Sequence, residues 1–303
     1  MRIDRPADAV YRPADTQVRP PRVLVFDSGL GGLTVLAELR KARPDAHFIY
    51  AADDAGFPYG RLSESNLITR VDRVLDRLIA QHQPDIVVIA CNTASTLVLP
   101  GLRARYSLPF VGTVPAIKPA AAASQSKVIS VLATAGTVKR DYTQGLINSF
   151  AADCTVALVG APRLAGLAED ALSGKDVVDG DIAAEIAPAF VEAQGRRTDA
   201  VVLACTHYPL LRAELEQLAP WPVTWIDSAP AIARRAVHLI GERGFAPHLG
   251  ETGATPPARA IFTGGALLTD QLAAALTARG LRDIVVDAMP LADGERALAA
   301  SQA

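Results

Sequence analysis

The sequence predicts an α/β fold of two pseudo-symmetric parallel-sheet domains, with the active site in the cleft between them. Short apolar, β-branched runs alternate with segments of helical periodicity, which is the pattern of strands buried in a parallel sheet. An internal repeat is the second observation: residues 85–95 and 199–209 each run from an Asp through such a strand to a cysteine and two polar residues. Because ligands bind outside the carboxyl ends of parallel strands, both cysteines are predicted to border one site.

The length of 303 residues also favours two domains, since a domain typically has about 100–200 residues. We expect residues 22–115 and 225–303 to form the first domain, because strand–helix crossovers pack back on the sheet they left. Residues 116–224 are expected to form the second. Residues 1–21 are rich in proline and charge and lack an apolar segment, so they predict a weakly ordered tail and no secretory signal.

The first half begins with an apolar strand at residues 23–26, followed by a glycine-rich turn at 27–34. Glycines there permit a tight turn and a close approach of the backbone. After a second strand at 47–50 comes a turn-rich loop, 53–60, and surface loops after parallel strands often carry function. Residues 64–82 then have the pattern of an amphipathic helix leading into the Cys91 strand.

The second half repeats this layout. A strand from residue 127 ends in a small polar turn at 134–137, as the first strand does after residue 22. Later elements are predicted from periodicity and turn residues alone. They are a helical turn at Glu169, a helix at 181–194, a strand end at 225–228, a helix at 229–241, a loop at 246–258, a helix near 269–279, and strands at 261–263 and 284–286.

Composition excludes several classes of protein. Half the residues are hydrophobic and the formal charge is −2, which gives no basis for direct nucleic-acid binding. No apolar run approaches the ~18 residues of a membrane span. Three cysteines make no disulfide framework and favour a reducing, cytoplasmic compartment. Metal-ligand spacing is missing, so no metal is expected.

Cys91 and Cys205 carry the chemical hypothesis. A free cysteine is usually a small buried hydrophobe, and Cys154, which has no counterpart in the repeat, is expected to be inert. Packing alone does not require a cysteine with polar followers at two strand ends. Asp27, at a neighbouring strand end, and His207, two residues beyond Cys205, are plausible proton-handling partners. Two such bases on opposite faces of one carbon are what inversion by deprotonation and reprotonation requires.

The same strand ends supply neutral donors for carboxylate groups. Hydroxyl and amide side chains lie there, with no Arg or Lys among them, which points to a cage of neutral donors. A pyridoxal enzyme needs a Schiff-base lysine, and all five lysines lie outside these motifs, so no cofactor is expected. The donors are Ser28, Asn92, Thr93, Thr134, Thr137 and Thr206.

These motifs together resemble the cofactor-independent aspartate/glutamate racemase superfamily, and within it the glutamate racemases. The resemblance spans roughly residues 22–240, and the motifs occur in the same order. One departure is Ala161-Pro162, where the family usually has a Cys-Pro pair; Glu169 is assigned from its distance to Pro162. The matching segments are 26–32, 57–60, 90–95, 114–120, 133–138 and 205–211.

The resemblance implies an isomerase that interconverts L- and D-glutamate and supplies D-glutamate for peptidoglycan synthesis. Cys91 would deprotonate D-glutamate and Cys205 L-glutamate. Asp27, Glu169 and His207 would be auxiliary catalytic groups. Substrate contacts are implied for Asp27, Ser28, Pro58, Tyr59, Gly60, Asn92, Thr93, Thr134, Thr137, Thr206 and His207.

Two alternatives remain open at this point. One is a two-cysteine racemase of aspartate or another acidic amino acid, since the Thr-His pair after Cys205 favours glutamate only by resemblance. The other is a regulatory binding protein such as a gyrase inhibitor. The oligomeric state, with a homodimer as one option, does not follow from the sequence.

Overall fold

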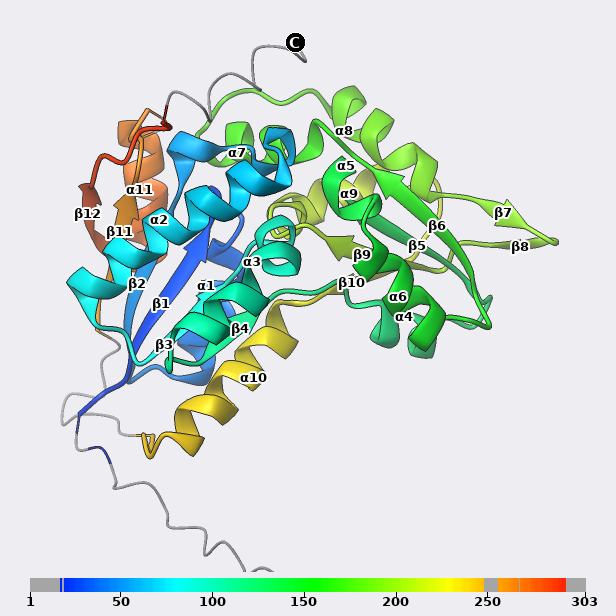
Figure 1. The fold of residues 1–303 in the computed structure, drawn as a ribbon. Coiled ribbons are helices and arrows are strands. Elements are labelled where there is room, and N and C mark those ends of the chain that lie inside the picture. The colour runs from blue at the N-terminus through cyan, green and yellow to red at the C-terminus, as the bar shows by residue number, and fades with distance from the viewer. Residues whose placement is uncertain (1–16, 18, 248–255, 267, 293–303) are drawn as a thin grey trace, which may run out of the picture.

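The computed structural model describes residues 17, 19–247, 256–266 and 268–292, and it confirms the predicted α/β class (Figure 1). Within these residues there are two separate parallel sheets, each covered by helices on both faces. The six-stranded sheet has the order β12-β11-β2-β1-β3-β4. Its strands are β1 (Arg22–Asp27), β2 (His47–Ala52), β3 (Ile86–Ile89), β4 (Phe110–Gly112), β11 (Ala258–Phe262) and β12 (Leu281–Val286).

The four-stranded sheet has the order β6-β5-β9-β10. This order is the same as β2-β1-β3-β4 in the larger sheet, so each half of the chain contains one copy of a four-stranded unit. Cys91 follows the third strand of the first unit and Cys205 the third strand of the second, which explains the repeat in the sequence. The strands are β5 (Val128–Ala133), β6 (Thr155–Gly160), β9 (Ala200–Ala204) and β10 (Thr224–Asp227).

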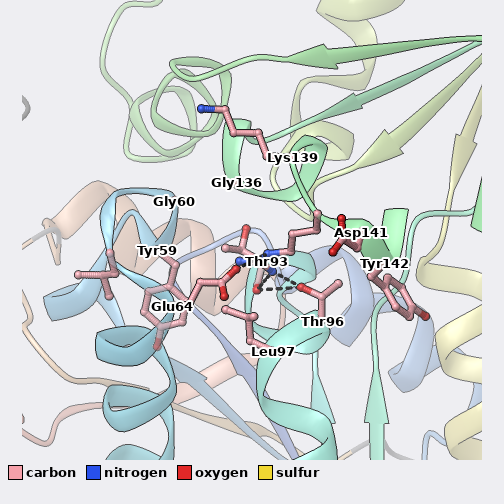
Figure 2. A pocket seen from close by; sticks show the side chains of 12 residues that line it. Tyr59, Gly60, Glu64, Thr93, Thr96, Leu97, Gly136, Lys139, Asp141 and Tyr142 are labelled. Atoms are coloured by element: carbon pink, nitrogen blue, oxygen red, sulfur yellow. Dashed lines mark hydrogen bonds and ion pairs between the residues drawn. The ribbon is translucent and has the colours of Figure 1, made fainter. Parts of the chain in front are cut away.

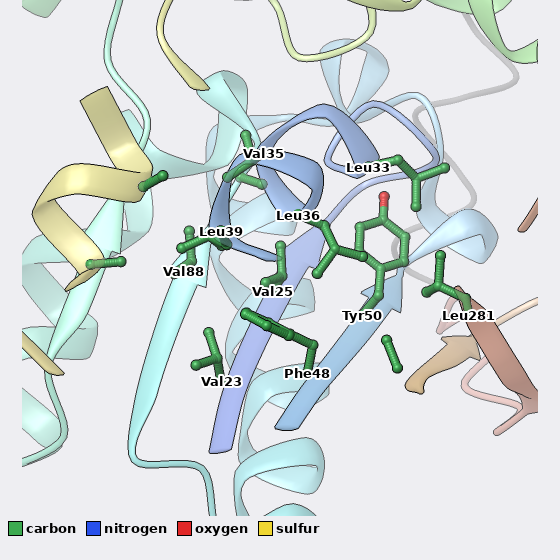
Figure 3. Packing of buried hydrophobic residues seen from close by; sticks show 14 of the residues in the cluster. Val23, Val25, Leu33, Val35, Leu36, Leu39, Phe48, Tyr50, Val88 and Leu281 are labelled. Atoms are coloured by element: carbon green, nitrogen blue, oxygen red, sulfur yellow. The ribbon is translucent and has the colours of Figure 1, made fainter. Parts of the chain in front are cut away.

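Apolar side chains seal the larger sheet on both faces. On one face, strand residues such as Val25 and Val88 pack with Leu36 and Leu39 of α1 (Leu33–Ala42) (Figure 3). The helices α10 (Ala229–Glu242) and α11 (Asp270–Ala278) complete that face. The other face is covered by α2 (Glu64–His82) and α3 (Asn92–Arg105), and α2 has the bounds predicted from its amphipathic pattern.

The smaller sheet is covered in the same way, with one helical layer on each face and strands buried between them. One layer lies at α4 (Ile117–Ala123) and α6 (Asp141–Phe150), next to the short α5 (Ala135–Val138). The other consists of α7 (Leu164–Leu172), α8 (Asp179–Ile186) and α9 (Arg212–Leu218). Short 3-10 turns occur at η1 (Asp54–Gly56), η2 (Tyr59–Arg61), η3 (Ala187–Ala189) and η4 (Tyr208–Leu211).

The chain returns to the first domain slightly later than residue 225, where we placed the boundary. Strand β10 pairs with β9, so residues up to Asp227 belong to the smaller sheet. The return occurs at α10, which packs against α1 and contributes Ala229 and Ile232 to the core of the larger sheet. The apolar residues of β10 do not by themselves reveal that this strand pairs with β9 at the edge of the smaller sheet.

The helix predicted at 181–194 is wrong in its second half. Helix α8 ends at Ile186 and gives way to the 3-10 turn η3, because Pro188 has no amide hydrogen to continue the α-helical hydrogen bonds. The chain then forms a hairpin of β7 (Glu192–Ala193) and β8 (Arg196–Arg197). Gln194 and Gly195 between them have φ of 54° and 72°, the positive values of a two-residue hairpin turn.

The end of the predicted tail is attached to the body. The Arg19 guanidinium forms a two-pronged ion pair with Asp85, at 2.6 and 2.7 Å, and lies over the Phe245 ring. The Gln17 amide donates to the carbonyl of Gly244. Residues 1–16 and most of the loop predicted at 246–258 lie outside the described residues.

Candidate active site

The carboxyl ends of the two sheets meet at one small cavity bordered by Cys91 and Cys205. Cys91 directly precedes α3 and Cys205 directly follows β9, and the two residues are 5 % and 6 % exposed. The cavity measures about 20 Å³. A water molecule needs about 10–15 Å³, so in this closed form there is room for about one water and not for an amino acid.

Most of the site residues predicted from sequence line this cavity. The others lie one hydrogen bond behind the wall: Asp27 contacts Thr206, Glu169 contacts His207, and Thr137 contacts Thr134. The predicted residues that line the cavity with the two cysteines are Ser28, Pro58, Tyr59, Gly60, Asn92, Thr93, Thr134, Thr206 and His207.

Two lining residues, Phe57 and Ala165, were missed by the sequence prediction. The Phe57 ring lies 5.4 Å from the His207 ring, so it shields the imidazole from solvent. The signal for Phe57 was its place in the turn-rich loop, within the segment 57–60 that resembles the family. Ala165 had no signal, because a small apolar residue on a helix has no chemical signature.

The Cys91 thiol is held in its protonated form. Burial raises the pKa of Cys91 to about 12, and the negative charge of Asp27 acts in the same direction. The Cys91 thiol lies 3.7 Å from the Ser28 hydroxyl oxygen. A thiol with this pKa is a proton donor at neutral pH and becomes a base only when a partner removes its proton.

Asp27 lies fully buried behind the thiols, at the end of β1. Its carboxylate accepts hydrogen bonds from the amides of Gly32 and Gly29, at 3.0 and 3.3 Å, and from the Thr206 hydroxyl at 3.3 Å. The Asp27 carboxylate therefore links the two domains directly. Its effect on Cys91 is electrostatic, since no hydrogen bond joins the two among the described residues.

The His207 imidazole is the titratable group that lies beside the Cys205 sulfur. The His207 Nδ1 lies 3.8 Å from the Cys205 sulfur, and its Nε2 lies 2.8 Å from Oε1 of Glu169. Burial alone lowers the pKa of His207, but its hydrogen bonds with Cys205 and Glu169 outweigh burial and raise this pKa well above its usual value. The imidazole is thus held as a cation that faces the sulfur on one side and a carboxylate on the other.

The glycine-rich turn is explained by close packing across the cleft. A Cβ atom added at Gly29 would lie 2.1 Å from Oε1 of Glu169, and one at Gly31 would lie 2.5 Å from Nδ1 of His207. Leu30, between them, donates its amide to Glu169 at 2.6 Å. Only glycine lets this turn of the first domain approach Glu169 and His207 of the second so closely.

Hydroxyl groups from both domains meet at the other end of the cavity. Oγ1 of Thr93, on α3, lies 3.2 Å from that of Thr134, which in turn lies 3.1 Å from that of Thr137. Beside them, both polar atoms of the Asn92 amide are buried without a partner among the described residues. Because buried polar groups are normally hydrogen-bonded, the Asn92 amide indicates a polar ligand.

The loop that carries Tyr59 rests on a buried ion pair. The Tyr59 hydroxyl donates to Asp53 at 2.5 Å, and Asp53 is paired with Arg70, both completely buried. Thr263 donates to the same carboxylate at 2.6 Å. A buried pair is stable only when its remaining hydrogen-bonding capacity is satisfied, and these contacts do so while fixing residues 58–60 against the cavity.

Other kinds of site find no support in the described part of the chain. There, no group of three or more His, Cys, Asp or Glu residues has the arrangement of a metal site. None of the described helices is both long and apolar enough to span a bilayer. All three cysteines are free thiols.

Two related α/β units that each bring one thiol to a shared cavity are expected of a racemase or epimerase that works with two bases. The chain belongs to the Asp/Glu/Hydantoin racemase family, whose model matches residues 33–236. The family predicted from the sequence motifs is therefore confirmed.

Within this family, the chain is similar to glutamate racemases. The chain is 56% identical to a glutamate racemase of Sinorhizobium medicae over 252 residues, which cover 82% of this chain and 90% of the relative. It is 57% identical to that of Brucella suis over 233 residues, covering 76% and 84%.

Solved structures of glutamate racemases are also similar to this chain. The Escherichia coli glutamate racemase, in complex with L-glutamate and the activator UDP-MurNAc-Ala, matches with a TM-score of 0.79 and 39% identity, covering 89% of this chain and 98% of that one. The Thermus thermophilus glutamate racemase matches with a TM-score of 0.67 and 27% identity, covering 90% and 97%.

Proposed function

We infer that this chain interconverts L- and D-glutamate by transferring protons between the substrate and two cysteines. The observation that carries this inference is that Cys91 and Cys205, from two related domains, border one cavity and have different partners. The relatives at 56–57% identity are glutamate racemases, which favours glutamate over aspartate as the substrate.

The two directions use the thiols in opposite roles. With L-glutamate, the Cys205 sulfur beside the His207 cation removes the α-proton, and the Cys91 thiol donates its own proton to the opposite face. The product is D-glutamate, with Cys205 protonated and Cys91 left as thiolate. With D-glutamate, we propose that Asp27 takes the proton of the Cys91 thiol and the Cys91 thiolate removes the α-proton. The His207 cation supplies the proton that Cys205 donates to the opposite face.

The rest of the wall would bind the substrate's charged ends. The Thr93, Thr134 and Thr137 hydroxyls and the unpartnered Asn92 amide are suited to a carboxylate. Ser28, Pro58, Tyr59, Gly60 and Thr206 would complete the contacts. Since the closed cavity holds about one water, the domains must separate to admit glutamate and close again before proton transfer.

The D-glutamate formed by this reaction would be used in peptidoglycan synthesis. We propose a cytoplasmic location, because catalysis by two free thiols requires a reducing compartment. A homodimer remains a proposal, and light scattering of the purified protein would test it. The formal charge of −2 gives no electrostatic basis for direct nucleic-acid binding.

Circular dichroism of L-glutamate incubated with metal-free, pyridoxal-free protein tests the activity. The expected result is decay of the signal to zero, the racemic endpoint, with L-aspartate unchanged in parallel. Protein in which Cys154 is replaced by Ala serves as the control that retains activity. An undiminished glutamate signal would refute the inference, and equal decay with L-aspartate would refute the specificity.

A further inference from the structure

Arg140 connects the two domains at the edge of the active site. It directly precedes α6 in the second domain, and its side chain is only 12 % exposed. Its Nη1 donates to the carbonyl oxygen of Thr93 at 2.6 Å and also to the Thr96 hydroxyl. Both acceptors lie on the first turns of α3 in the first domain, directly after Cys91.

These contacts lie beside a second, larger pocket of about 450 Å³. It shares Tyr59, Gly60 and Thr93 with the catalytic cavity, so the two spaces adjoin. Figure 2 shows Tyr59 and Thr93 on the first-domain side of this pocket and Lys139 on the second-domain side. The larger pocket therefore borders the catalytic cavity, and the Arg140 guanidinium crosses between its two sides.

We propose that Arg140 is a positioning residue that holds the second domain on the first turns of α3, and that its contacts with Thr93 and Thr96 must break to admit glutamate. The proposal rests on the proposed function for its substrate. When the contacts re-form, they set the position of Thr93, whose hydroxyl meets that of Thr134 across the same boundary at 3.2 Å. Closure and assembly of the hydroxyl cluster are thereby one event.

The strength of this connection comes from the α3 acceptors. Bonds from a guanidinium to a carbonyl and a hydroxyl in a part-buried position are charge-assisted. The third partner, Glu64, lies 3.7 Å from Nε and is 69 % exposed, so solvent weakens that ion pair. Burial lowers the pKa of Arg140, and the negative charge of Glu64 acts in the opposite direction.

Kinetics of Arg140→Gln and Arg140→Lys provide the first test, with Lys139→Gln as the matched control. Lys139 is the neighbouring cation in the same pocket, and its side chain points away from Thr93 and Thr96 (Figure 2). Loss of charge-assisted bonds is expected to lower kcat/KM about 10- to 100-fold in the Gln variant. Arg140→Lys should recover part of this, and Lys139→Gln should stay within about twofold of wild type.

Thiol labelling provides a second test that needs no turnover. Iodoacetamide labelling is followed at each cysteine by peptide mass spectrometry, with the more accessible Cys154 as the internal reference. In Arg140→Gln, Cys91 and Cys205 should both label faster relative to Cys154. Thr96→Val, which removes an acceptor from the other domain, should shift labelling in the same direction by a smaller factor.

Each outcome bears on the proposal. Faster labelling of both catalytic thiols with an unchanged melting temperature supports it, even if glutamate proved not to be the substrate. Wild-type labelling in both Arg140→Gln and Thr96→Val would overturn it, whatever the kinetics. Acceleration of Cys91 alone would also overturn it, because a local charge effect leaves the second domain in place.

Discussion

Replacing His207 by Gln should slow proton transfer at Cys205 and leave proton transfer at Cys91 intact. The substitution removes the cation held 3.8 Å from the Cys205 sulfur and 2.8 Å from the Glu169 carboxylate. Glu169 keeps its hydrogen bond from the Leu30 amide, so the turn of the first domain stays attached. A general acid–base group contributes about 10²–10⁴-fold, and we expect a loss of kcat/KM in this range.

The loss of kcat/KM must be the same from either enantiomer, because the equilibrium constant between free enantiomers is one. Primary isotope effects separate the two steps. In His207→Gln, the Cys205 step becomes the slower one. The isotope effect on kcat/KM should therefore rise with α-deuterated L-glutamate and fall toward one with α-deuterated D-glutamate.

Asp27→Asn is the matched variant, and it should give the opposite pattern because an amide cannot take the proton of the Cys91 thiol. In both variants the enantiomer whose isotope effect rises identifies the impaired thiol. Isotope effects that change equally from both sides in both variants would refute the division of labour between the thiols. The family assignment would be unaffected by that result.

Three further predictions follow from the same geometry. Cys91→Ser and Cys205→Ser should each lower racemisation at least about 10²-fold in the dichroism assay, whereas Cys154→Ala keeps it, and loss in all three would refute the assignment. Gly31→Ala places a Cβ 2.5 Å from Nδ1 of His207, so kcat/KM should fall at least about tenfold while Gly101→Ala, in open space, has no effect. Above pH about 9, the wild-type free energy of unfolding should fall relative to that of Cys91→Ala by up to about 1.4 kcal/mol per pH unit, because the thiol ionises at lower pH in the unfolded chain than in the folded one. Denaturant titrations measure this difference, and parallel curves for the two proteins would contradict the raised pKa of Cys91.

The sequence by itself determined the α/β class and the positions of the two thiols. Apolar β-branched runs have little alternative to buried parallel strands, and a residue at the carboxyl end of such a strand faces the ligand crevice. The repeat around Cys91 and Cys205 added the pseudo-symmetry, which the common strand order of the two sheets bears out. The fold class, the cysteine positions and the repeat all depend on the order of neighbouring residues, which can be read directly from a single sequence.

Only the tertiary structure decided which groups meet across the cleft. The Leu30 amide and Glu169 are 139 residues apart in the sequence, Glu169 and His207 are 38 apart, and the glycines that permit this packing had no visible reason in the sequence. Strand β10 and Arg140 also took their places from neighbours that no local pattern identifies. The physical reason is that pairing at a sheet edge and contacts between domains depend on how two separately folded surfaces fit, whereas strand and helix formation depends mainly on the periodicity of adjacent residues.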